Sequence, residues 1–203
     1  MKTYPTIRYF QPFDVGKNIT AFQKLDGSNI RAEWNRKRNF YKFGSRNHLI
    51  SESDVPFGEA VRLIREQEEE LNKILLSTKM ESAVCFFEFW GENSRFGQHQ
   101  KELHHCTLID ISLFKKGYLV PGEFIELFSK TAPVLYQGLL SESFVQSVKD
   151  GTLEGLGSEG VVCKGALDKK TGQPFMVKLK RQSWFDDLKK FCGGDEKKFK
   201  ELA

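Results

Sequence analysis

The sequence predicts a mixed α+β fold in which antiparallel strands dominate. Three observations support this class: strand-like runs separated by turn residues in 19–43, one long amphipathic helix pattern, and apolar strand patterns farther along the chain. No internal repeat or low-complexity tract interrupts this order. At 203 residues and 39% hydrophobic, the chain is long enough for one core, with room for a small appendage.

Residues 19–43 contain two turn signals between strand-like runs. The first is Asp26-Gly27 and the second spans residues 36–39, so we expect two linked hairpins. Residues 57–76 follow as a predicted helix whose apolar residues recur at helical spacing. Its apolar face comprises Val61, Ile64, Leu71 and Leu75.

The remaining elements are read from apolar runs and helix start signals. Residues 82–90 form an almost uninterrupted apolar run, which predicts a buried strand carrying Glu88 near its end. The other expected elements are a strand at 106–113, helices at 121–130 and 141–149, and strands at 160–164 and 175–180 around the turn-rich segment 168–174. After Trp184 we expect a helical tail that Gly193-Gly194 interrupts.

Composition excludes several classes of protein. No apolar run approaches the roughly 20 residues that cross a bilayer, so a protein of the cytoplasm, or of a host cytoplasm if viral, without a membrane partner is expected. The four cysteines form no CxxC pair, which argues against a disulfide framework or a structural zinc site. We interpret them as reduced, mostly buried thiols.

Basic residues are concentrated in one stretch, although the formal net charge is only +4. Arg31, Arg36, Lys37, Arg38, Lys42 and Arg46 lie there, interleaved with Trp34, Phe40 and Tyr41. This pattern is typical of a nucleic-acid surface and equally of a solvated hairpin.

The segment from Lys24 to Asn29 places a lysine just before a tight turn. Gly27 lacks a Cβ, so the backbone there is able to approach a phosphate closely. Lys24 is a candidate nucleophile if nearby cations and burial favour its neutral form. The alternative is a hairpin turn with a surface lysine.

Lys178 and Lys180 alternate with apolar neighbours, so on a strand both amines leave the same face. Two ammonium groups there are suited to flank one phosphate and to neutralise charge that grows during displacement. An amphipathic edge strand explains the same alternation.

Two carboxylates complete the set of candidates. Glu159 opens an apolar strand beside Gly160 and is suited to bind Mg²⁺ through oxygen. Glu88 lies among aromatic residues, where an acid is costly unless it is paired or bound to a ligand. A structural ion pair is the alternative for each. His99, His104, His105 and Cys106 cluster, but their spacing fits no common zinc signature.

Five motifs in this order resemble those of the covalent nucleotidyltransferase superfamily, which comprises ATP-dependent DNA ligases, RNA ligases and mRNA capping enzymes. They are Lys24-x-Asp26-Gly27, Ser45-Arg46, Phe87-Glu88-Phe89, Glu159-Gly160-Val161-Val162 and Lys178-x-Lys180. The ending Gly27-Ser28-Asn29 looks like the RNA ligases, particularly the nick-sealing branch, because the other members usually carry arginine at the place of Asn29. The resemblance implies an ATP-grasp-like adenylyltransferase domain of the DNA/RNA ligase type, with antiparallel sheets flanked by helices.

The resemblance also implies a reaction in three steps. Lys24 attacks the α-phosphate of ATP and becomes lysyl-AMP, AMP moves to an RNA 5′-phosphate, and an RNA 3′-hydroxyl displaces AMP. It implies catalytic roles for Lys24, Lys178, Lys180 and Glu159, with Glu159 as a metal ligand or as the carboxylate that positions lysine. The implied nucleotide-binding residues are Gln23, Lys24, Asn29, Arg46, Glu88, Ile109, Glu159, Lys178 and Lys180. ATP and Mg²⁺ are the implied cofactors, and RNA repair is the implied setting.

Two departures from the family pattern shape these expectations. Ile109 stands where relatives place an aromatic residue that stacks on adenine, which weakens the preference for ATP over GTP. Only a short tail follows Lys180, so we expect an adenylation domain at 1–181, a helical tail at 182–203 that docks on it, and no OB-fold. The chain is then a minimal ligase, a catalytic domain whose C-terminal domain is missing, or a subunit whose partner supplies RNA binding.

Alternatives to an RNA ligase remain open at this point. They are a compact ATP-dependent DNA ligase, another adenylyltransferase, or a nucleic-acid-binding module of the same fold without turnover.

Overall fold

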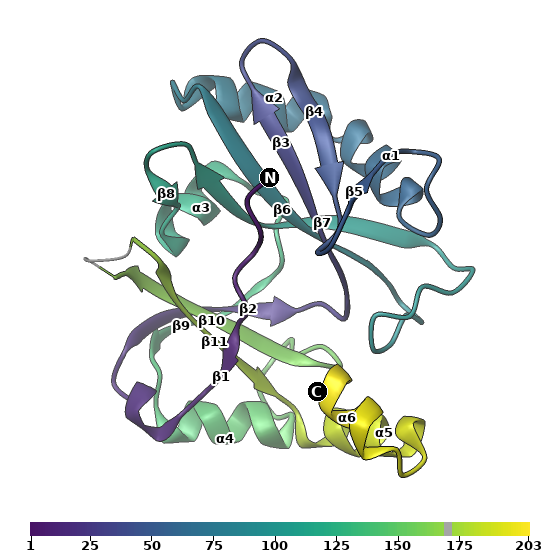
Figure 1. Ribbon diagram of the computed structural model, residues 1–203. Helices are drawn as coiled ribbons and strands as arrows, with labels where there is room; N and C mark the ends of the chain where they lie inside the picture. Colours follow the sequence, from purple (N-terminus) through teal and green to yellow (C-terminus); the bar gives the residue numbers. More distant parts are fainter. Residues whose placement is uncertain (169–171) are drawn as a thin grey trace. The chain divides into compact units, whose positions relative to one another are not determined.

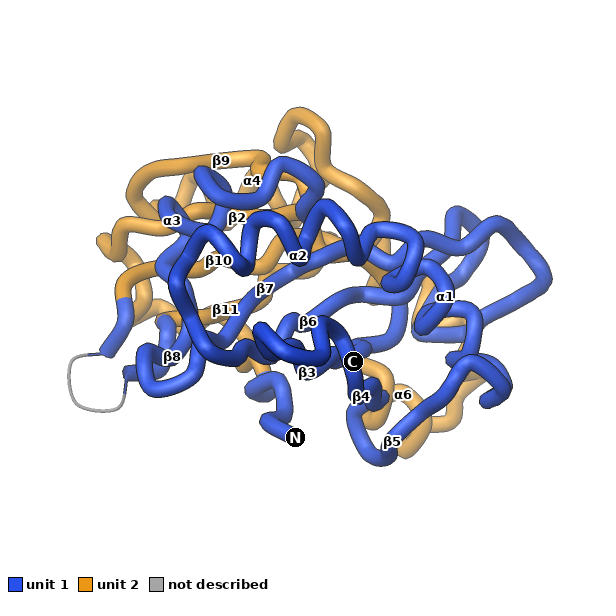
Figure 2. Tube along the Cα trace, turned by 90° about the horizontal axis from the view of Figure 1, so that it is seen from above, with its two compact units in different colours: residues 1–6, 27–132, 167–174 blue, residues 7–26, 133–166, 175–203 orange. Residues whose placement is uncertain are grey.

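A computed structural model describes residues 1–168 and 172–203 (Figure 1). The fold is mixed α+β with antiparallel sheets, as the sequence predicts. The chain divides into two compact units (Figure 2). The first unit comprises residues 1–6, 27–132 and 167–174, and the second comprises residues 7–26, 133–166 and 175–203. Each unit therefore draws on segments that are far apart in the sequence.

The first unit is built on an antiparallel sheet with the strand order β5-β4-β3-β6-β7-β8. Its strands are β3 (Gly27–Asn35), β4 (Asn39–Gly44), β5 (Leu49–Ile50), β6 (Ser82–Gly91), β7 (His104–Leu113) and β8 (Gly117–Tyr118). The helices are α1 (Gly58–Glu66), α2 (Glu68–Ser77) and α3 (Pro121–Leu127). α1 packs against β7 and α2 against β4, so both lie along the sheet (Figure 1). The predicted buried strand at 82–90 is confirmed, with Phe86, Phe87 and Phe89 fully buried.

The second unit is built on a sheet with the strand order β1-β11-β10-β2-β9. Its strands are β1 (Arg8–Tyr9), β2 (Asn18–Lys24), β9 (Val134–Leu139), β10 (Gly160–Leu167) and β11 (Pro174–Lys180). The helical segments are η1 (Pro12–Asp14), α4 (Glu142–Asp150), α5 (Gln182–Cys192) and α6 (Glu196–Leu202). β9 and β10 pair antiparallel with β2, whereas β1 runs parallel to β11. The core lies between this sheet and α4, and includes Ile19, Ala21, Phe144, Val148, Val161, Val177 and Leu179.

The hairpin predicted at Asp26-Gly27 is wrong. β2 ends at Lys24 and pairs with β9 and β10, whereas β3 begins at Gly27 and pairs with β4 and β6, so this turn carries the chain from one sheet to the other. Gly27 lies opposite Trp90, and a Cβ there would collide with the carbonyl of Phe89. The partner strands come from distant parts of the sequence, which a local turn signal does not reveal. The second hairpin is confirmed, because β3 pairs with β4.

The helix predicted at 57–76 is two helices that meet at Gln67. The Gln67 amide Nε2 donates to the carbonyls of Leu63 and Cys106, which ties the break between α1 and α2 to β7. The predicted apolar face is correct, because Val61, Ile64, Leu71 and Leu75 are all buried.

Most other predicted elements are confirmed, with shifted ends. The Ser141 hydroxyl caps α4 by accepting from the amide of Phe144, and α3 is shorter than predicted. The tail forms α5 and α6, and α5 packs against α4 within the second unit, with Trp184, Leu188 and Cys192 buried. The sequence pattern missed β9, whose side chains are mostly exposed or half-buried. Residues 169–171 of the turn predicted at 168–174 lie outside the described residues.

Three further expectations concern the whole chain. All four cysteines are free and buried, as predicted. The division into an adenylation domain at 1–181 and a tail at 182–203 stays a prediction, because the two units follow the sheets rather than a boundary in the sequence. Over the described residues, no helix is long and apolar enough to cross a membrane.

Candidate active site

The second unit brings three of the predicted site residues into direct contact around one carboxylate. Glu159 Oε2 accepts from Lys24 Nζ at 2.9 Å, and Oε1 accepts from Lys180 Nζ at 3.0 Å. The side chains of Glu159 and Lys180 are each 3% exposed, and that of Lys24 is 22% exposed. Each oxygen of the carboxylate thus holds one ammonium group. The alternative of a surface lysine in a hairpin turn is therefore wrong for Lys24.

Strand pairing explains why these residues meet. Lys24 is the last residue of β2 and lies opposite Gly160, the first residue of β10, so Glu159 reaches the end of β2. Gly160 has φ 145°, and a Cβ there would come within 2.8 Å of the Lys180 Cα. A glycine is therefore required where β10 begins beside the end of β11. The backbone of β11 occupies the space predicted beside Gly160, because a Cβ there would collide with the Leu179 carbonyl oxygen.

Lys178 and Lys180 each lie over an aromatic ring. Lys178 Nζ lies 4.2 Å from the ring centroid of Tyr9 and donates to the backbone oxygen of Ala203 at 3.1 Å. Lys180 Nζ lies 3.2 Å from the ring centroid of Trp184. Phe185 contacts both rings, at centroid distances of 6.1 Å to Tyr9 and 5.4 Å to Trp184. Both amines therefore face a row of aromatic rings formed by Tyr9, Phe185 and Trp184. This agrees with the prediction that both amines leave the same face of the strand.

Trp184 also reaches the turn that follows Lys24. Its indole Nε1 donates to Asp26 Oδ2 at 3.3 Å, while its ring lies beneath the Lys180 ammonium. Trp184 thus links Lys180 to the Lys24-x-Asp26-Gly27 motif. Motif spacing did not identify this role or that of Tyr9. The only signal in the sequence is an aromatic residue four positions after Lys180.

Burial changes the acid-base properties of this cluster. Desolvation lowers the pKa of Lys180 to about 8, and the positive charges of Lys24 and Lys178 act in the same direction, while Glu159 opposes them. Desolvation also raises the pKa of Tyr9 to about 12. Lys180 is therefore a cation that becomes neutral within reach of physiological pH.

We expect the Lys180 amine to titrate near pH 8 in the native protein and near its ordinary value of 10.5 in the unfolded chain. Because the unfolded chain binds more protons between these values, the Lys180 contribution to unfolding free energy should rise as pH increases through this window. Competitive acylation of amines across pH, read by peptide mass spectrometry, measures both midpoints. A native midpoint near 10.5 would contradict the desolvated geometry, and the same measurement in denaturant is the control.

Gln23 precedes Lys24 on β2, and its contacts are local to the second unit. The backbone N–H of Gln23 donates to the Pro133 carbonyl at 2.8 Å. The Gln23 side chain packs so closely against Gly157 that a Cβ on Gly157 would collide with it. The predicted contact of Gln23 with adenine stays a prediction.

The other predicted site residues belong to the first unit. Asn29 on β3 and Glu88 on β6 lie opposite each other in the sheet, so their side chains share a face, and Asn29 Nδ2 donates to the Phe87 carbonyl at 3.3 Å. Ile109 is half-buried on β7, at an irregularity in its pairing with β6. Arg46 is exposed in the loop between β4 and β5. The first unit thus brings Asn29 and Glu88 together.

Ser28 contacts a histidine that the motifs did not include. His99 Nε2 and Ser28 Oγ are hydrogen-bonded at 2.8 Å, and His104 Nδ1 bonds Glu59 Oε2 at 2.9 Å. Desolvation and the neighbouring His104 lower the pKa of His99. Within the part of the chain that the structure describes, no group of three His, Cys, Asp or Glu residues is arranged to hold a metal ion.

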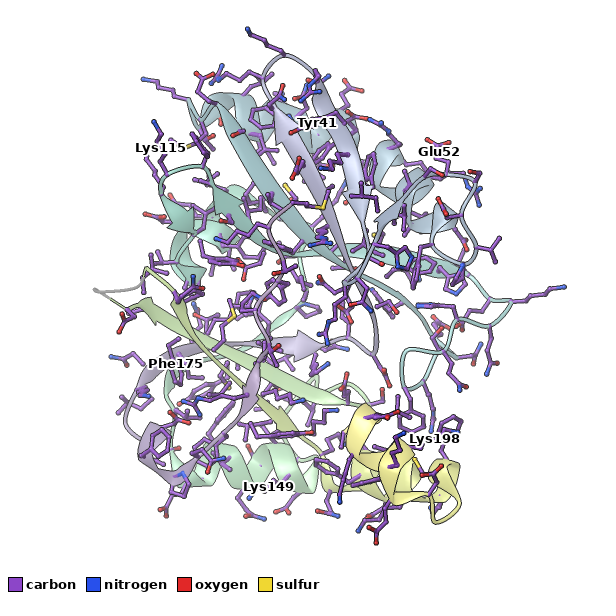
Figure 3. The ribbon with its side chains drawn as sticks, in the orientation of Figure 1. Tyr41, Glu52, Lys115, Lys149, Phe175 and Lys198 are labelled. Atoms are coloured by element: carbon purple, nitrogen blue, oxygen red, sulfur yellow. The ribbon has the colours of Figure 1, made fainter. Side chains whose placement is uncertain are left out.

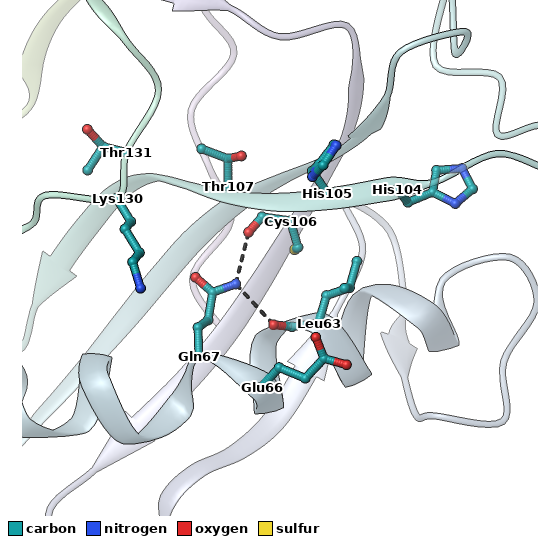
Figure 4. A pocket seen from close by; sticks show the side chains of 9 residues that line it. All are labelled: Leu63, Glu66, Gln67, His104, His105, Cys106, Thr107, Lys130 and Thr131. Atoms are coloured by element: carbon teal, nitrogen blue, oxygen red, sulfur yellow. Dashed lines mark hydrogen bonds between the residues drawn. The ribbon is translucent and has the colours of Figure 1, made fainter.

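A cavity of about 380 Å³ lies in the first unit (Figure 4). Figure 4 shows Gln67 pointing from the break between α1 and α2 toward Cys106 on β7. The lining residues are Leu63, Glu66, Gln67, His104, His105, Cys106, Thr107, Lys130 and Thr131. None of them is a predicted site residue.

The family model described as RNA ligase matches residues 17–180. A structure of Naegleria gruberi RNA ligase with PPi aligns with a TM-score of 0.68 and 19% identity, over 94% of this chain and 58% of that chain. A variant of that ligase with AMP and Mn gives 0.67 and 19%, over 92% and 58%. Another variant, with ATP and Mn, gives 0.67 and 20%, over 92% and 58%.

The solved structures show a shared fold, and this chain spans 58% of the length of those ligase chains. No curated protein matches the sequence.

Proposed function

Because this chain belongs to the RNA ligase family, we propose that it is an ATP-dependent RNA ligase that forms lysyl-AMP at Lys24. The observation that carries the proposal is the Glu159 carboxylate, which holds Lys24 and Lys180 within 3.0 Å on its two oxygens. A nucleophilic amine, a proton acceptor and a buried cation are thereby placed within one cluster.

In the first step, Lys24 Nζ attacks the α-phosphate of ATP. The new N–P bond forms as the P–O bond to pyrophosphate breaks, and Lys24 gives up the proton that blocks its lone pair. Glu159 Oε2 is the hydrogen-bonded acceptor for that proton, at 2.9 Å. Lys180 and Lys178 stabilise the charge that grows on the phosphate oxygens.

The nucleotide roles of the first unit follow the family motifs. We propose that Asn29 and Glu88 contact the nucleotide from the shared face of β3 and β6, with Arg46 and Ile109 as further contacts. The nucleotide contacts would be completed by Gln23, next to Lys24, and by Lys178 and Lys180. The opposed positions of Asn29 and Glu88 on adjacent strands support the roles of these two residues.

A divalent metal is part of the proposed reaction, because relatives of the same fold were solved with ATP and Mn and with AMP and Mn. Both oxygens of Glu159 accept from lysines in this structure, so Glu159 fits the role of positioning lysine better than that of a resident ligand. Mg²⁺ commonly binds one or two carboxylates together with nucleotide phosphates and water, which suits a site of this kind. When bound, the metal would neutralise phosphate charge.

The later steps define the proposed substrate. AMP moves from Lys24 to an RNA 5′-phosphate, and an RNA 3′-hydroxyl then displaces AMP and seals the strand. We propose a nick-sealing role in RNA repair in the cytoplasm, with a partner subunit or a further domain adding RNA contacts. The family match supports RNA as the acceptor.

Intact-protein mass spectrometry after incubation with ATP and Mg²⁺ tests the proposal. We expect a mass increase of one AMP, mapped by peptide analysis to Lys24, with parallel incubations using Mn²⁺ and GTP. Absence of an adduct under every condition would overturn the proposed function. An adduct on another lysine would overturn the role of Lys24.

Trp184→Leu should slow AMP attachment about tenfold and leave the KM for ATP nearly unchanged, because the ring that positions the desolvated Lys180 ammonium is lost. Trp184→Phe keeps an aromatic face beneath the amine and should recover most of the rate. Single-turnover adenylation measures both. Leu188→Ala is the control, since it removes a buried side chain of the same helix and should lower stability while sparing the rate. Equal rates for Trp184→Leu and Trp184→Phe would refute the positioning role.

A further inference from the structure

The loop that leads into β2 presents an aromatic ring to solvent. Phe13 in η1 is 73% exposed, although it belongs to a firmly held segment. The buried Asp14 carboxylate accepts from the backbone N–H of Gln11 at 2.9 Å. The Leu140 carbonyl accepts from the N–H of Gly16, and the Leu140 N–H donates to the carbonyl of Lys17. The ring is therefore held outward by a fixed turn rather than by a loose terminus.

Two cations are fixed beside this ring. Arg8 donates two hydrogen bonds of 2.6 Å to the Asp14 carboxylate, and Lys17 Nζ donates a third at 2.8 Å. Arg8 Cζ lies 5.3 Å and Lys17 Nζ 5.8 Å from the Phe13 ring centroid. The hydrogen bonds from Arg8 and Lys17 hold the pKa of Asp14 well below its usual range. One buried anion thus orders two cations, and one positive charge is in excess.

A second aromatic ring, that of Phe175 on β11, lies beside the same two cations; Figure 3 labels it. Lys17 Nζ lies 4.2 Å and Arg8 Cζ 5.8 Å from the Phe175 ring centroid, so both cations adjoin both rings. The side chains of Arg8 and Lys17 are still 44% and 42% exposed. Phe175 is half-buried and packs against the core, whereas Phe13 is exposed. An exposed ring stacks on a nucleic-acid base and adjacent cations bind phosphates, which is how single strands are held without sequence preference.

We propose that Arg8, Phe13, Lys17 and Phe175, here called the Phe13 platform, bind single-stranded RNA, with a base on Phe13 and phosphates at Arg8 and Lys17. This inference rests on the proposed function, because it names where the RNA substrate is held.

β2 sets the distance between the Phe13 platform and the nucleophile. Lys17 immediately precedes β2 and Lys24 ends it, so strand geometry separates them by about 20 Å. A stacked strand rises about 3.4 Å per base, so about six nucleotides span this distance. The platform therefore contacts a strand about six nucleotides from the end that reacts at Lys24.

Fluorescence anisotropy with labelled single-stranded RNA of about twelve nucleotides, twice the span of β2, tests the proposal. Phe13→Ala should weaken binding about tenfold, because base stacking on an aromatic side chain contributes about that factor. Lys17→Gln should lower the slope of log Kd against log salt by about 0.7, as one phosphate contact is lost. Phe114→Ala is the matched control: Phe114 is 59% exposed, with Lys115 Nζ 5.4 Å from its ring centroid, and it lies in the first unit.

The length of the RNA gives a second readout. A trinucleotide is long enough to place one base on Phe13 and phosphates at Arg8 and Lys17, so Phe13→Ala should weaken its binding by a similar factor. Unchanged binding of the longer RNA by Phe13→Ala, or an equal loss with Phe114→Ala, would overturn the proposal.

AMP attachment to Lys24, measured without RNA, separates this inference from the proposed function. Phe13→Ala should form the adduct at the wild-type rate. An adduct together with unaltered RNA binding in Phe13→Ala would reject the platform alone. A wild-type protein that binds RNA through Phe13 and forms no adduct would reject the ligase function and retain the platform.

Discussion

Lys24→Ala should abolish AMP attachment and leave the protein folded. No other group takes the place of the amine that forms the N–P bond, so the loss is complete rather than partial. Folding should be spared because Glu159 keeps Lys180 as a partner at 3.0 Å, so the buried charge stays compensated. We expect a change in unfolding free energy of about 1 kcal/mol, since the Lys24 side chain is partly exposed.

Intact mass measurement and thermal unfolding check the two parts of this prediction. Lys149→Ala is the matched control, because Lys149 is exposed on α4 of the same unit (Figure 3) and should leave the adduct unchanged. An AMP adduct on the Lys24→Ala protein would exclude Lys24 as the nucleophile.

Glu159→Gln should reduce both stability and activity. It removes the anion between two ammonium groups and leaves Lys180, whose side chain is 3% exposed, without the compensating charge of Glu159. Removing one partner of a buried pair costs about 3 to 5 kcal/mol, which for a chain of this length lowers the melting temperature by about 10 °C. AMP attachment should slow by about a hundredfold or more, because the proton acceptor for Lys24 is lost.

A double variant separates these two effects. Lys180→Met combined with Glu159→Gln removes the uncompensated buried cation, so it should recover much of the stability that Glu159→Gln loses. It should not recover AMP attachment, because the double variant still lacks both the Glu159 carboxylate that accepts the proton and the positive charge of Lys180. The AMP-attachment rates of the single and double variants are compared at a temperature well below the melting temperature of each, so that unfolding does not contribute to the difference. Full activity of Glu159→Gln would show that the carboxylate only supports the fold.

Local patterns in the sequence predicted those parts of the fold that depend on near neighbours. The apolar run of β6 predicted a buried strand, and Ser141 predicted the start of α4 because a hydroxyl there satisfies a free amide. The alternation of Lys178 and Lys180 correctly predicted two amines facing one row of side chains. The glycine that follows Glu159 indicated a position that needs room, and there the backbone of β11 passes too close for a Cβ.

Features that depend on distant partners were missed. Asp26-Gly27 has the composition of a hairpin turn, yet β6 and β10 draw the flanking strands into different sheets. The break at Gln67 arises from a hydrogen bond to Cys106 on β7, which no helix pattern contains. Trp184 acquires its role only when α5 folds back toward Lys180 and Asp26. Contacts of this kind follow from the tertiary fold and leave no local signature.

The order in which the chain is synthesised bears differently on the two units. Most of the first unit, residues 27–132, is one continuous segment whose strands have emerged from the ribosome before the later strands exist. The second unit combines residues 7–26 with residues 133–166 and 175–203. β2 therefore cannot pair with β9 and β10, nor Lys24 with Glu159 and Lys180, until synthesis has passed residue 180. Because contacts between such distant segments form slowly, we expect the charged cluster to assemble on a nascent chain after the sheet of the first unit.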